Sequence, residues 1–297
     1  MNTLIKHIKK ISDERWNIGF FENSLDSIMK GDAIKVRWMK HAFKDRWFAD
    51  PFILDVTDKE IIVLAEEFYK PIYRGRISRL IIDRKTLELK KLDTVLQLDS
   101  HLSFPFIERL GKDIFLYPEN GARGGLWRYK YNVNDNTIEL VGKVCVMPVE
   151  DSVITTLFGG KKMFATCQPY PNGRTMLIFE WDAEKEEFTP VTEYHFKENI
   201  ARMAGDFFSY NGKIYCPNQE CNIQYGHAVC LQEVELRDDK WHFKEVRRLH
   251  SVNPTLNIGT HTFNMYKGLI VTDALGFDNY WLRVILKKLH ILHPLGN

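Results

Sequence analysis

The stretch Trp47-Phe48-Ala49-Asp50-Pro51-Phe52 places one acid at the start of an apolar strand, just ahead of a proline. Proline has no N–H group for a sheet ladder, so within sheets it occurs at the first residue of a strand or on an edge. Asp50 is therefore predicted to lie at the mouth of a strand, where its carboxylate can project into a cavity. This layout indicates the architecture because it recurs along the chain.

Each copy of the layout has a residue that opens an apolar strand, a turn, and a second strand that ends in a polar residue. The openings lie about fifty residues apart, at Asp50, Phe104, Asp151, Asp206 and His261. The second strands end at Glu66, Glu119, Gln168, Gln219 and Asp273. Two more strands follow each of the first four copies. Four strands per unit at a period of about 40 to 55 residues are typical of a propeller blade.

The fifth copy stops after two strands, at Asp273. Residues 16–22 resemble the missing third strand, and residues 33–39 could form the fourth. Lending N-terminal strands to the last blade would close the ring without an open sheet edge. We therefore predict an all-β fold, a five-bladed β-propeller that forms a single domain over residues 1–297, with residues 14–40 completing the fifth blade. Two stacked β domains are the alternative.

The amino-acid composition and the net charge argue against several classes of partner and site. The 41 basic and 39 acidic residues give a net charge of +2, which argues against a nucleic-acid partner. The five cysteines form no Cys-x-x-Cys pair, which favours reduced thiols over a disulfide framework or a zinc site. No secretory signal is evident, and no apolar run approaches the roughly 18 residues of a membrane span. A cytoplasmic location is expected.

Two basic segments flank the predicted ring. Residues 2–11 and 279–292 both show the spacing of amphipathic helices, with isoleucines and leucines on one face and lysines opposite. Packing on the domain itself is the first interpretation. Peripheral contact with an anionic membrane surface is the second.

The entry residues of the innermost strands are expected to surround one mouth of the propeller. The repeat places Asp50, Asp151 and Asp206 at three entries, with Phe104 and His261 at the other two. Acids that converge from different blades should have separated pKa values. A charged carboxylate beside a protonated one is what glycoside hydrolysis requires.

Three motifs, Trp47–Phe52, His101–Phe106 and Tyr117–Glu119, together with these acids resemble the five-bladed glycoside hydrolases of family 43. Closer still is the family-43-like propeller domain of bacterial polysaccharide-synthesis loci and plant glucosamine inositolphosphorylceramide transferases. The resemblance covers roughly residues 14–275. It is more informative about the fold than about the activity, because function depends on the site that a fold carries.

The resemblance implies an inverting glycosidase with no organic cofactor. Asp50 matches the general base, and Asp151 matches the acid that orients the partner and tunes its pKa. Asp206 occupies the place of the general acid, where the family has glutamate, and Glu119 is the possible substitute. A channel histidine often helps to hold Ca²⁺ in this family, and His261 is the candidate ligand.

An oligo- or polysaccharide is the predicted partner. The side chains proposed to contact it are His101, Arg123, Trp127, Arg202, Tyr225 and His261, with Tyr170 as a further stacking candidate. Structural alternatives remain: an Arg202–Asp206 ion pair, a Glu119–Arg123 ion pair, and histidines that only line the wall. Arg74, Arg76 and Arg123 could meet an anionic sugar or a phosphate, and solvated arginines are the alternative.

Three functions stay open at this point. The first is a glycosidase. The second is a non-catalytic glycan-binding or accessory protein in cell-surface polysaccharide biosynthesis. The third is a protein-interaction propeller.

Overall fold

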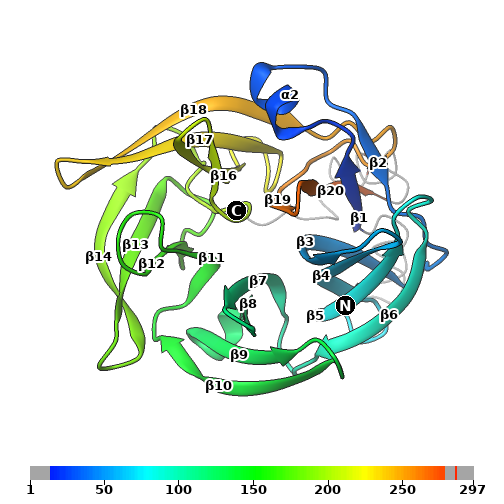
Figure 1. Ribbon diagram of the computed structural model, residues 1–297, viewed down its shortest axis with the longest axis horizontal. Helices are drawn as coiled ribbons and strands as arrows, with labels where there is room; N and C mark the ends of the chain where they lie inside the picture. The colour runs from blue at the N-terminus through cyan, green and yellow to red at the C-terminus, as the bar shows by residue number, and fades with distance from the viewer. Residues whose placement is uncertain (1–13, 278–284, 286–297) are drawn as a thin grey trace.

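Five four-stranded antiparallel sheets form a closed ring in the computed structural model, which describes residues 14–277 and Ile285 (Figure 1). Blade 1 contains β3 (Arg46–Val56), β4 (Glu60–Tyr69), β5 (Arg74–Asp83) and β6 (Leu89–Leu96). Blade 2 contains β7 (Ser103–Leu110), β8 (Asp113–Glu119), β9 (Leu126–Asn132) and β10 (Thr137–Cys145). Blade 3 contains β11 (Val149–Thr155), β12 (Lys162–Cys167), β13 (Thr175–Asp182) and β14 (Glu187–His195). Blade 4 contains β15 (Phe208–Tyr210), β16 (Lys213–Glu220), β17 (Ala228–Arg237) and β18 (Lys240–His250).

Blade 5 is built from both ends of the ring. Its strands are β19 (Phe263–Tyr266), β20 (Leu269–Phe277), β1 (Glu14–Phe21) and β2 (Val36–Trp38). The N-terminal strand β1 pairs with β20 from Glu14 opposite Phe277 to Phe20 opposite Val271. The predicted five-bladed propeller, with its last blade closed by N-terminal strands, is thus confirmed. The pairing removes the open edge that the truncated fifth repeat would otherwise expose.

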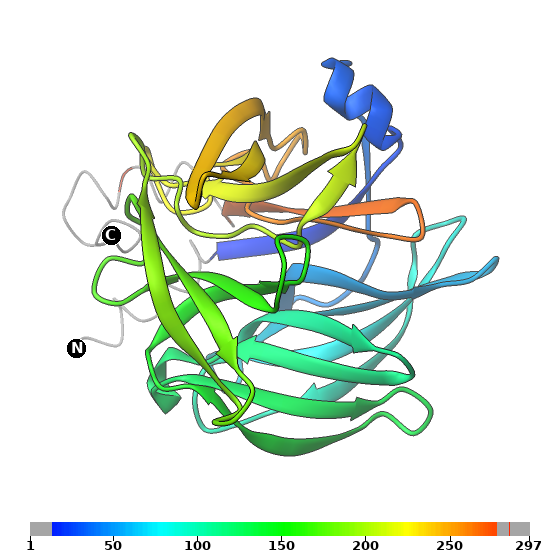
Figure 2. The ribbon, with the colours of Figure 1, turned by 60° about the vertical axis from the view of Figure 1, so that its left-hand side comes forward.

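Short connections complete the ring. Helix α2 (Leu25–Lys30) lies between β1 and β2, and a 3₁₀ turn, η1 (Gly121–Arg123), lies between β8 and β9. The Ser24 side chain caps α2 by accepting from the Ser27 N–H. Figure 2 shows α2 standing out from the ring. Arg247 of β18 donates to the Asp32 carbonyl just after the helix, which ties α2 to blade 4.

Aromatic side chains pack the blades against each other. Phe52 of blade 1 meets Phe104 of blade 2 edge to face, with ring centroids 5.0 Å apart. Phe164 of blade 3 meets Phe207, which precedes the first strand of blade 4, at 4.8 Å. Such pairs add roughly 0.5–1.5 kcal/mol beyond the area that they bury. The high aromatic content therefore serves the core between blades.

A bulge near the start of the innermost strand positions the functional side chains. Asp50, Phe104 and Asp151 have positive φ angles of 49°, 40° and 46°, and each lies at a break in strand register. The left-handed conformation is unfavourable for residues other than Gly, Asn and Asp. Its recurrence in blades 1, 2 and 3 shows that the repeat in the sequence is a repeat in backbone geometry.

The predicted helices at residues 2–11 and 279–292 lie outside the described residues, apart from Ile285. Within residues 14–277, no helix has the length and apolar character to cross a membrane. The proposed membrane contact of the two ends therefore stays a prediction.

Candidate functional site

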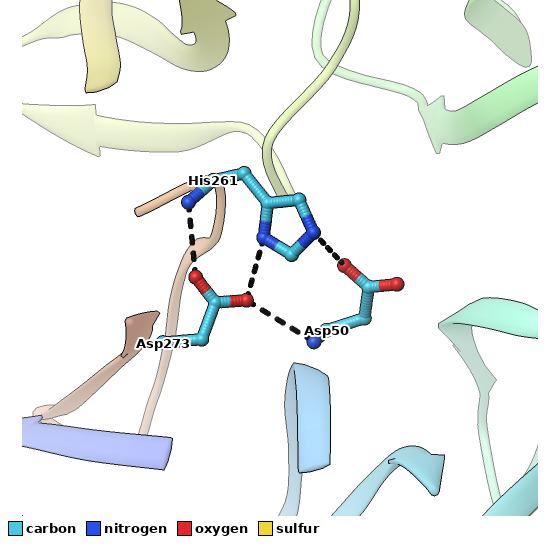
Figure 3. Close-up of side chains that lie close together, drawn as sticks. All are labelled: Asp50, His261 and Asp273. Atoms are coloured by element: carbon cyan, nitrogen blue, oxygen red, sulfur yellow. Dashed lines mark hydrogen bonds and ion pairs between the residues drawn. The ribbon is translucent and has the colours of Figure 1, made fainter. Parts of the chain in front are cut away.

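A histidine between two aspartates occupies the entry face, the end of the ring where β3, β7 and β11 begin (Figure 3). His261 Nδ1 lies 2.6 Å from Asp273 Oδ2, and its Nε2 lies 3.4 Å from Asp50 Oδ1. All three residues are buried. The Thr262 hydroxyl donates to Asp273 Oδ2 at 2.8 Å, and the Trp16 ring stacks on the imidazole at 4.0 Å. We call these five residues the histidine cluster.

The histidine cluster holds a protonated imidazole. Burial lowers the pKa of His261, but Asp273 and Asp50 raise it more, to about 9. Burial opposes ionisation of Asp273, and His261 together with hydrogen bonds from its own N–H and from Thr262 outweighs that effect and lowers the pKa of Asp273. Burial raises the pKa of Asp50 to about 7, against the lowering effect of His261 and with a further raising effect of Asp151. The carboxylate next to the charge pair therefore titrates near neutral pH.

At position 226 the backbone passes so close to His261 that only glycine fits. Gly226 has φ +61°, and a Cβ at this position would lie 2.9 Å from the His261 Cβ. A side chain there would push the histidine away from the aspartates. The loop from β16 to β17 thus holds the imidazole in place through its own backbone.

Asp50, His261 and Asp273 of the histidine cluster could each offer a metal ion one ligand atom, since these atoms lie within 4.8 Å of one another. A histidine ligand needs a free nitrogen lone pair. Both ring nitrogens of His261 instead face carboxylates, and the pKa of about 9 keeps both protonated near neutral pH. In this arrangement the imidazolium itself supplies the positive charge, and the predicted Ca²⁺ with His261 as a ligand stays a prediction.

A second cation, Arg202, lies in the same face and is surrounded by acids from blades 2 and 3. Its Nε donates to Asp151 Oδ2 at 2.5 Å, its Nη1 to Glu150 Oε2 at 2.9 Å, and its Nη2 to Glu119 Oε2 at 3.0 Å. Nη1 also donates to Asn172 Oδ1 at 3.1 Å. We call these five residues the arginine cluster. A planar guanidinium with donors in a fixed fork suits this arrangement of acceptors.

The acids of the arginine cluster share one counter-charge. Glu119 Oε2 accepts from the Asp151 N–H as well as from Arg202. Burial raises the pKa of Glu119 well above its usual range, and the neighbouring Asp151 and Glu150 raise it further, although Arg202 lowers it. Like charges in a buried space favour one protonated carboxyl.

Tyr225 connects the two clusters. The Arg202 guanidinium lies 5.1 Å from the centre of its ring, and the His261 ring meets it edge to face at 5.4 Å. Asp151 of the arginine cluster also contributes to the raised pKa of Asp50 in the histidine cluster. The two clusters therefore form one electrostatic site.

The polar residues that end the second strands all contribute to this face. Glu119 binds Arg202 and Asp273 binds His261. The remaining three also pair there: Glu66 with His101, Gln168 with Glu150, and Gln219 with Asp151. Asp273, Gln219, Thr262 and Trp16 were not predicted as site residues. The signal for Asp273 and Gln219 was present, since both occupy the strand-end position of the repeat.

Residues 35–269 match the family described as "Glucosamine inositolphosphorylceramide transferase 1, N-terminal". The chain belongs to this family. It is 26% identical over 275 residues to glucosamine inositolphosphorylceramide transferase 1 of Arabidopsis thaliana, covering 81% of this chain and 34% of that protein. The chain thus spans about a third of the length of that relative.

Solved structures of glycoside hydrolase family 43 share the fold of this family member. A β-xylosidase/α-arabinofuranosidase from a compost microbial metagenome superposes with a TM-score of 0.55, covering 80% of this chain and 93% of that one. An endo-arabinanase from Bacillus licheniformis gives 0.53, covering 80% and 96%. Both are 10% identical in sequence, so the likeness establishes the fold alone.

Asp206 does not share the position of Asp50 and Asp151 in this family member. In blade 4 Met203 lies opposite Asn218, and regular pairing resumes only at Phe208 opposite Tyr215. In blade 4, four residues of the entry segment (204–207) thus lie between these two pairs. The corresponding bulges of blades 1 to 3 each contain two residues. Blade 4 contributes Arg202, and no acid from its entry strand, to the arginine cluster.

The Asp206 carboxyl group lies at a cavity of about 310 Å³, lined by residues from the far ends of β7 and β11. Its Oδ1 accepts from the Phe207 N–H at 2.7 Å. Burial raises the pKa of Asp206 to about 7, against the lowering effects of that hydrogen bond and of Arg109. Asp206 is thus an acid of the opposite end of the ring, and the alternative Arg202–Asp206 ion pair does not form.

The other side chains that were predicted to contact a sugar form contacts within the protein, and His101 is in addition half exposed. His101 is half exposed, and its Nε2 lies 3.0 Å from Glu66 Oε1. Arg123 donates to the Tyr129 hydroxyl and lies 4.0 Å from the Trp127 ring centre, so the alternative pairing with Glu119 is not formed. Two further arginines are paired as well: Arg76 with Glu67, and Arg74 with the Leu98 carbonyl.

Proposed function

We propose that this chain is a glycan-binding domain that holds a sugar at the entry face and does not cleave it by the family-43 acid/base scheme. The carbohydrate class is supported by the name of its own family and by the sugars in the names of the structures that share its fold. Because the chain spans only part of its relatives, the transferase activity in their name is not carried over to it.

The observation that carries this proposal is the place of Arg202. Acid/base hydrolysis needs a proton donor opposite the base, and the resemblance to family 43 implies that blade 4 supplies it. Blade 4 supplies a permanent cation instead, and that cation binds Glu119, Glu150 and Asp151. Both oxygens of Glu119 are already engaged, Oε2 by Arg202 and the Asp151 N–H and Oε1 by the Ser103 hydroxyl, so this carboxyl group is not free to approach a leaving oxygen.

The entry face carries groups that suit the binding of a sugar. The site presents carboxylate acceptors at fixed positions, because Asp50, Glu119 and Asp151 are each held by a hydrogen bond from a neighbouring blade. Sugar hydroxyls both donate and accept, so an array of fixed acceptors recognises them by orientation. Preorganised groups lose little freedom on binding.

The test is a titration of the whole chain with xylotriose, arabinotriose and the trisaccharide of glucosamine, followed by calorimetry and by ligand-observed NMR. At least one trisaccharide should bind, and Asp50→Asn should weaken binding several-fold, because the amide alters the hydrogen bonds around Phe104 and Thr262. Thermal unfolding of the variant would verify that it folds. Failure of every trisaccharide to bind at millimolar concentration would contradict the proposal.

Acid/base hydrolysis is the second candidate, favoured by the raised pKa values of Asp50 and Glu119. Asp50 would deprotonate water, and a protonated Glu119 would donate to the leaving oxygen. Aryl xylosides and arabinosides provide the assay. Product release by the wild type that disappears in both Asp50→Asn and Glu119→Gln would replace the binding proposal with this one.

A further inference from the structure

A cleft of about 400 Å³ lies beside the arginine cluster, between the loop that follows β12 and the loop that follows β16. Its wall is formed by Pro169, Tyr170, Pro171, Asn172, Gly173, Asn199 and residues 221–225. Ligand pockets in proteins usually have volumes of about 300–1,000 Å³. The cleft therefore has room for a small ligand or for one unit of a larger one.

The side chains that line this cleft carry no formal charge at neutral pH. A cavity of about 320 Å³ at the opposite end of the ring differs, because its lining includes one acid, Asp55, and four basic residues: Arg79, Arg109, Lys112 and Lys267. An anionic ligand in the cleft would lose its hydration without gaining a counter-charge from the wall. The lining thus favours an uncharged ligand.

The polar groups of the cleft are amides with hydrogen-bonding capacity to spare. Within residues 14–277, the Asn199 side chain, the Asn172 Nδ2 and the Gln224 Oε1 have no hydrogen-bond partner, although Asn172 Oδ1 and Gln224 Nε2 are both engaged. These groups offer donors and acceptors in one small space. Hydroxyl groups, which donate and accept at once, match such a set.

Flat and apolar side chains complete the cleft. Tyr170 is 80% exposed and Ile223 is 75% exposed, so both stand at its rim. An aromatic ring presents a broad apolar surface at low cost in conformational entropy. A sugar ring has a C–H face and a rim of hydroxyls, so it can use both the aromatic surface and the amides.

The cleft is continuous with the site. Asn172 accepts from Arg202, and Tyr225 contacts both Arg202 and His261, so two cleft residues also belong to or touch the clusters. A ligand in the cleft therefore lies next to a sugar held at the entry face. We propose that the cleft is a second subsite, which takes an uncharged sugar unit adjoining the one at the clusters. This inference rests on the proposed glycan binding.

The experiment compares a monosaccharide with its uncharged trisaccharide, xylose with xylotriose and glucose with cellotriose, by calorimetry. Tyr170→Ala should weaken trisaccharide binding about five- to tenfold and leave monosaccharide binding within about twofold. Asn199→Ala should have the same selectivity with a smaller effect. Both side chains lack a structural hydrogen bond within residues 14–277, so these variants should fold normally.

The matched control is Tyr73→Ala, which removes an exposed tyrosine from the corresponding loop of blade 1 and should leave trisaccharide affinity unchanged. Unaltered trisaccharide affinity in Tyr170→Ala, or an equal loss for monosaccharide and trisaccharide, would overturn the subsite while glycan binding stands. Tighter binding of a trigalacturonate than of the uncharged trisaccharides would overturn the proposed preference of the subsite for an uncharged sugar. Absence of any glycan binding by the wild type would instead remove the proposed function, and the subsite with it.

Discussion

The histidine cluster and the arginine cluster both neutralise buried carboxylates, one with an imidazolium and the other with a guanidinium. In each, buried carboxylates from more than one blade surround a single positive side chain. His261 can lose its proton in the accessible pH range, whereas Arg202 remains charged. The comparison shows that the cation of the histidine cluster can be lost at high pH, while the cation of the arginine cluster is retained.

The two clusters also differ in how the chain builds them. The histidine cluster joins strands at the closure of the ring, since Asp50 comes from blade 1 and His261 and Asp273 come from blade 5. The arginine cluster joins blades 2, 3 and 4. Together they connect all five blades at one face, so damage to either should affect stability as well as binding.

The largest effect is expected for Arg202→Met, which leaves the acids of the arginine cluster without their cation. Removing one partner of a buried ion pair costs about 3–5 kcal/mol. Urea unfolding at pH 7 measures the loss. Arg248→Met is the control, because Arg248 is partly exposed and pairs with Glu198 and Glu245 at the surface, where about 0–1 kcal/mol is expected. Equal losses in both variants would show that Arg202 is no more important than a surface arginine.

The second effect is a loss of stability at alkaline pH that arises from the His261 imidazolium. The pKa of His261 is about 9 in the folded protein and about 6.5 in an unfolded chain, so its stabilisation is complete below pH 6.5 and is lost as the pH rises through 9. Between pH 7.5 and 9.5 the free energy of unfolding should fall by about 2 kcal/mol more in the wild type than in His261→Gln.

Urea unfolding at several pH values measures this difference, and working above pH 7.5 keeps it separate from the titration of Asp50 near pH 7. His195→Gln is the control, because His195 is exposed and its ring nitrogens contact only the surface side chains of Glu193 and Thr175 among the described residues. Parallel pH curves for wild type and His261→Gln would mean that His261 is not the protonated centre of its cluster.

The smallest effect on binding is expected for Asp206→Asn, because Asp206 belongs to neither cluster. Affinity for the trisaccharides should change by less than about twofold, since the side chain lies at a different cavity. The pKa of Asp206 is raised to about 7, so its contribution to stability is present below pH 4 and is lost as the pH rises through 7. The Asp206→Asn variant should lack this loss of stability with rising pH. Thermal unfolding of both proteins between pH 4 and 8 measures the difference.

Loss of glycan affinity in Asp206→Asn, in a variant that unfolds at the wild-type temperature, would place Asp206 back in the binding site. It would also restore the original assignment of three equivalent entry acids.

Much of the architecture was readable from the chain itself. The alternation of apolar strands, turns and polar strand ends predicts the number of blades, and the incomplete fifth copy predicts that residues near the N-terminus close the ring. These features are local and periodic, and backbone pairing depends on them directly. The strand-end residues Glu119 and Asp273 belong to the same signal, and both reach the entry face.

Which charges pair was decided only by the tertiary structure. Arg202 precedes Asp206 by four residues, yet it bonds to Glu119, which is 83 residues away, and to Asp151, which is 51 away. The longer bulge of blade 4 separates Arg202 from Asp206, and no residue type in the sequence marks its length. Ion pairing depends on side-chain positions to within an ångström or two, whereas strand pattern depends only on the order of polar and apolar residues. The sequence therefore determined the ring, and the packing of the blades determined the chemistry at its mouth.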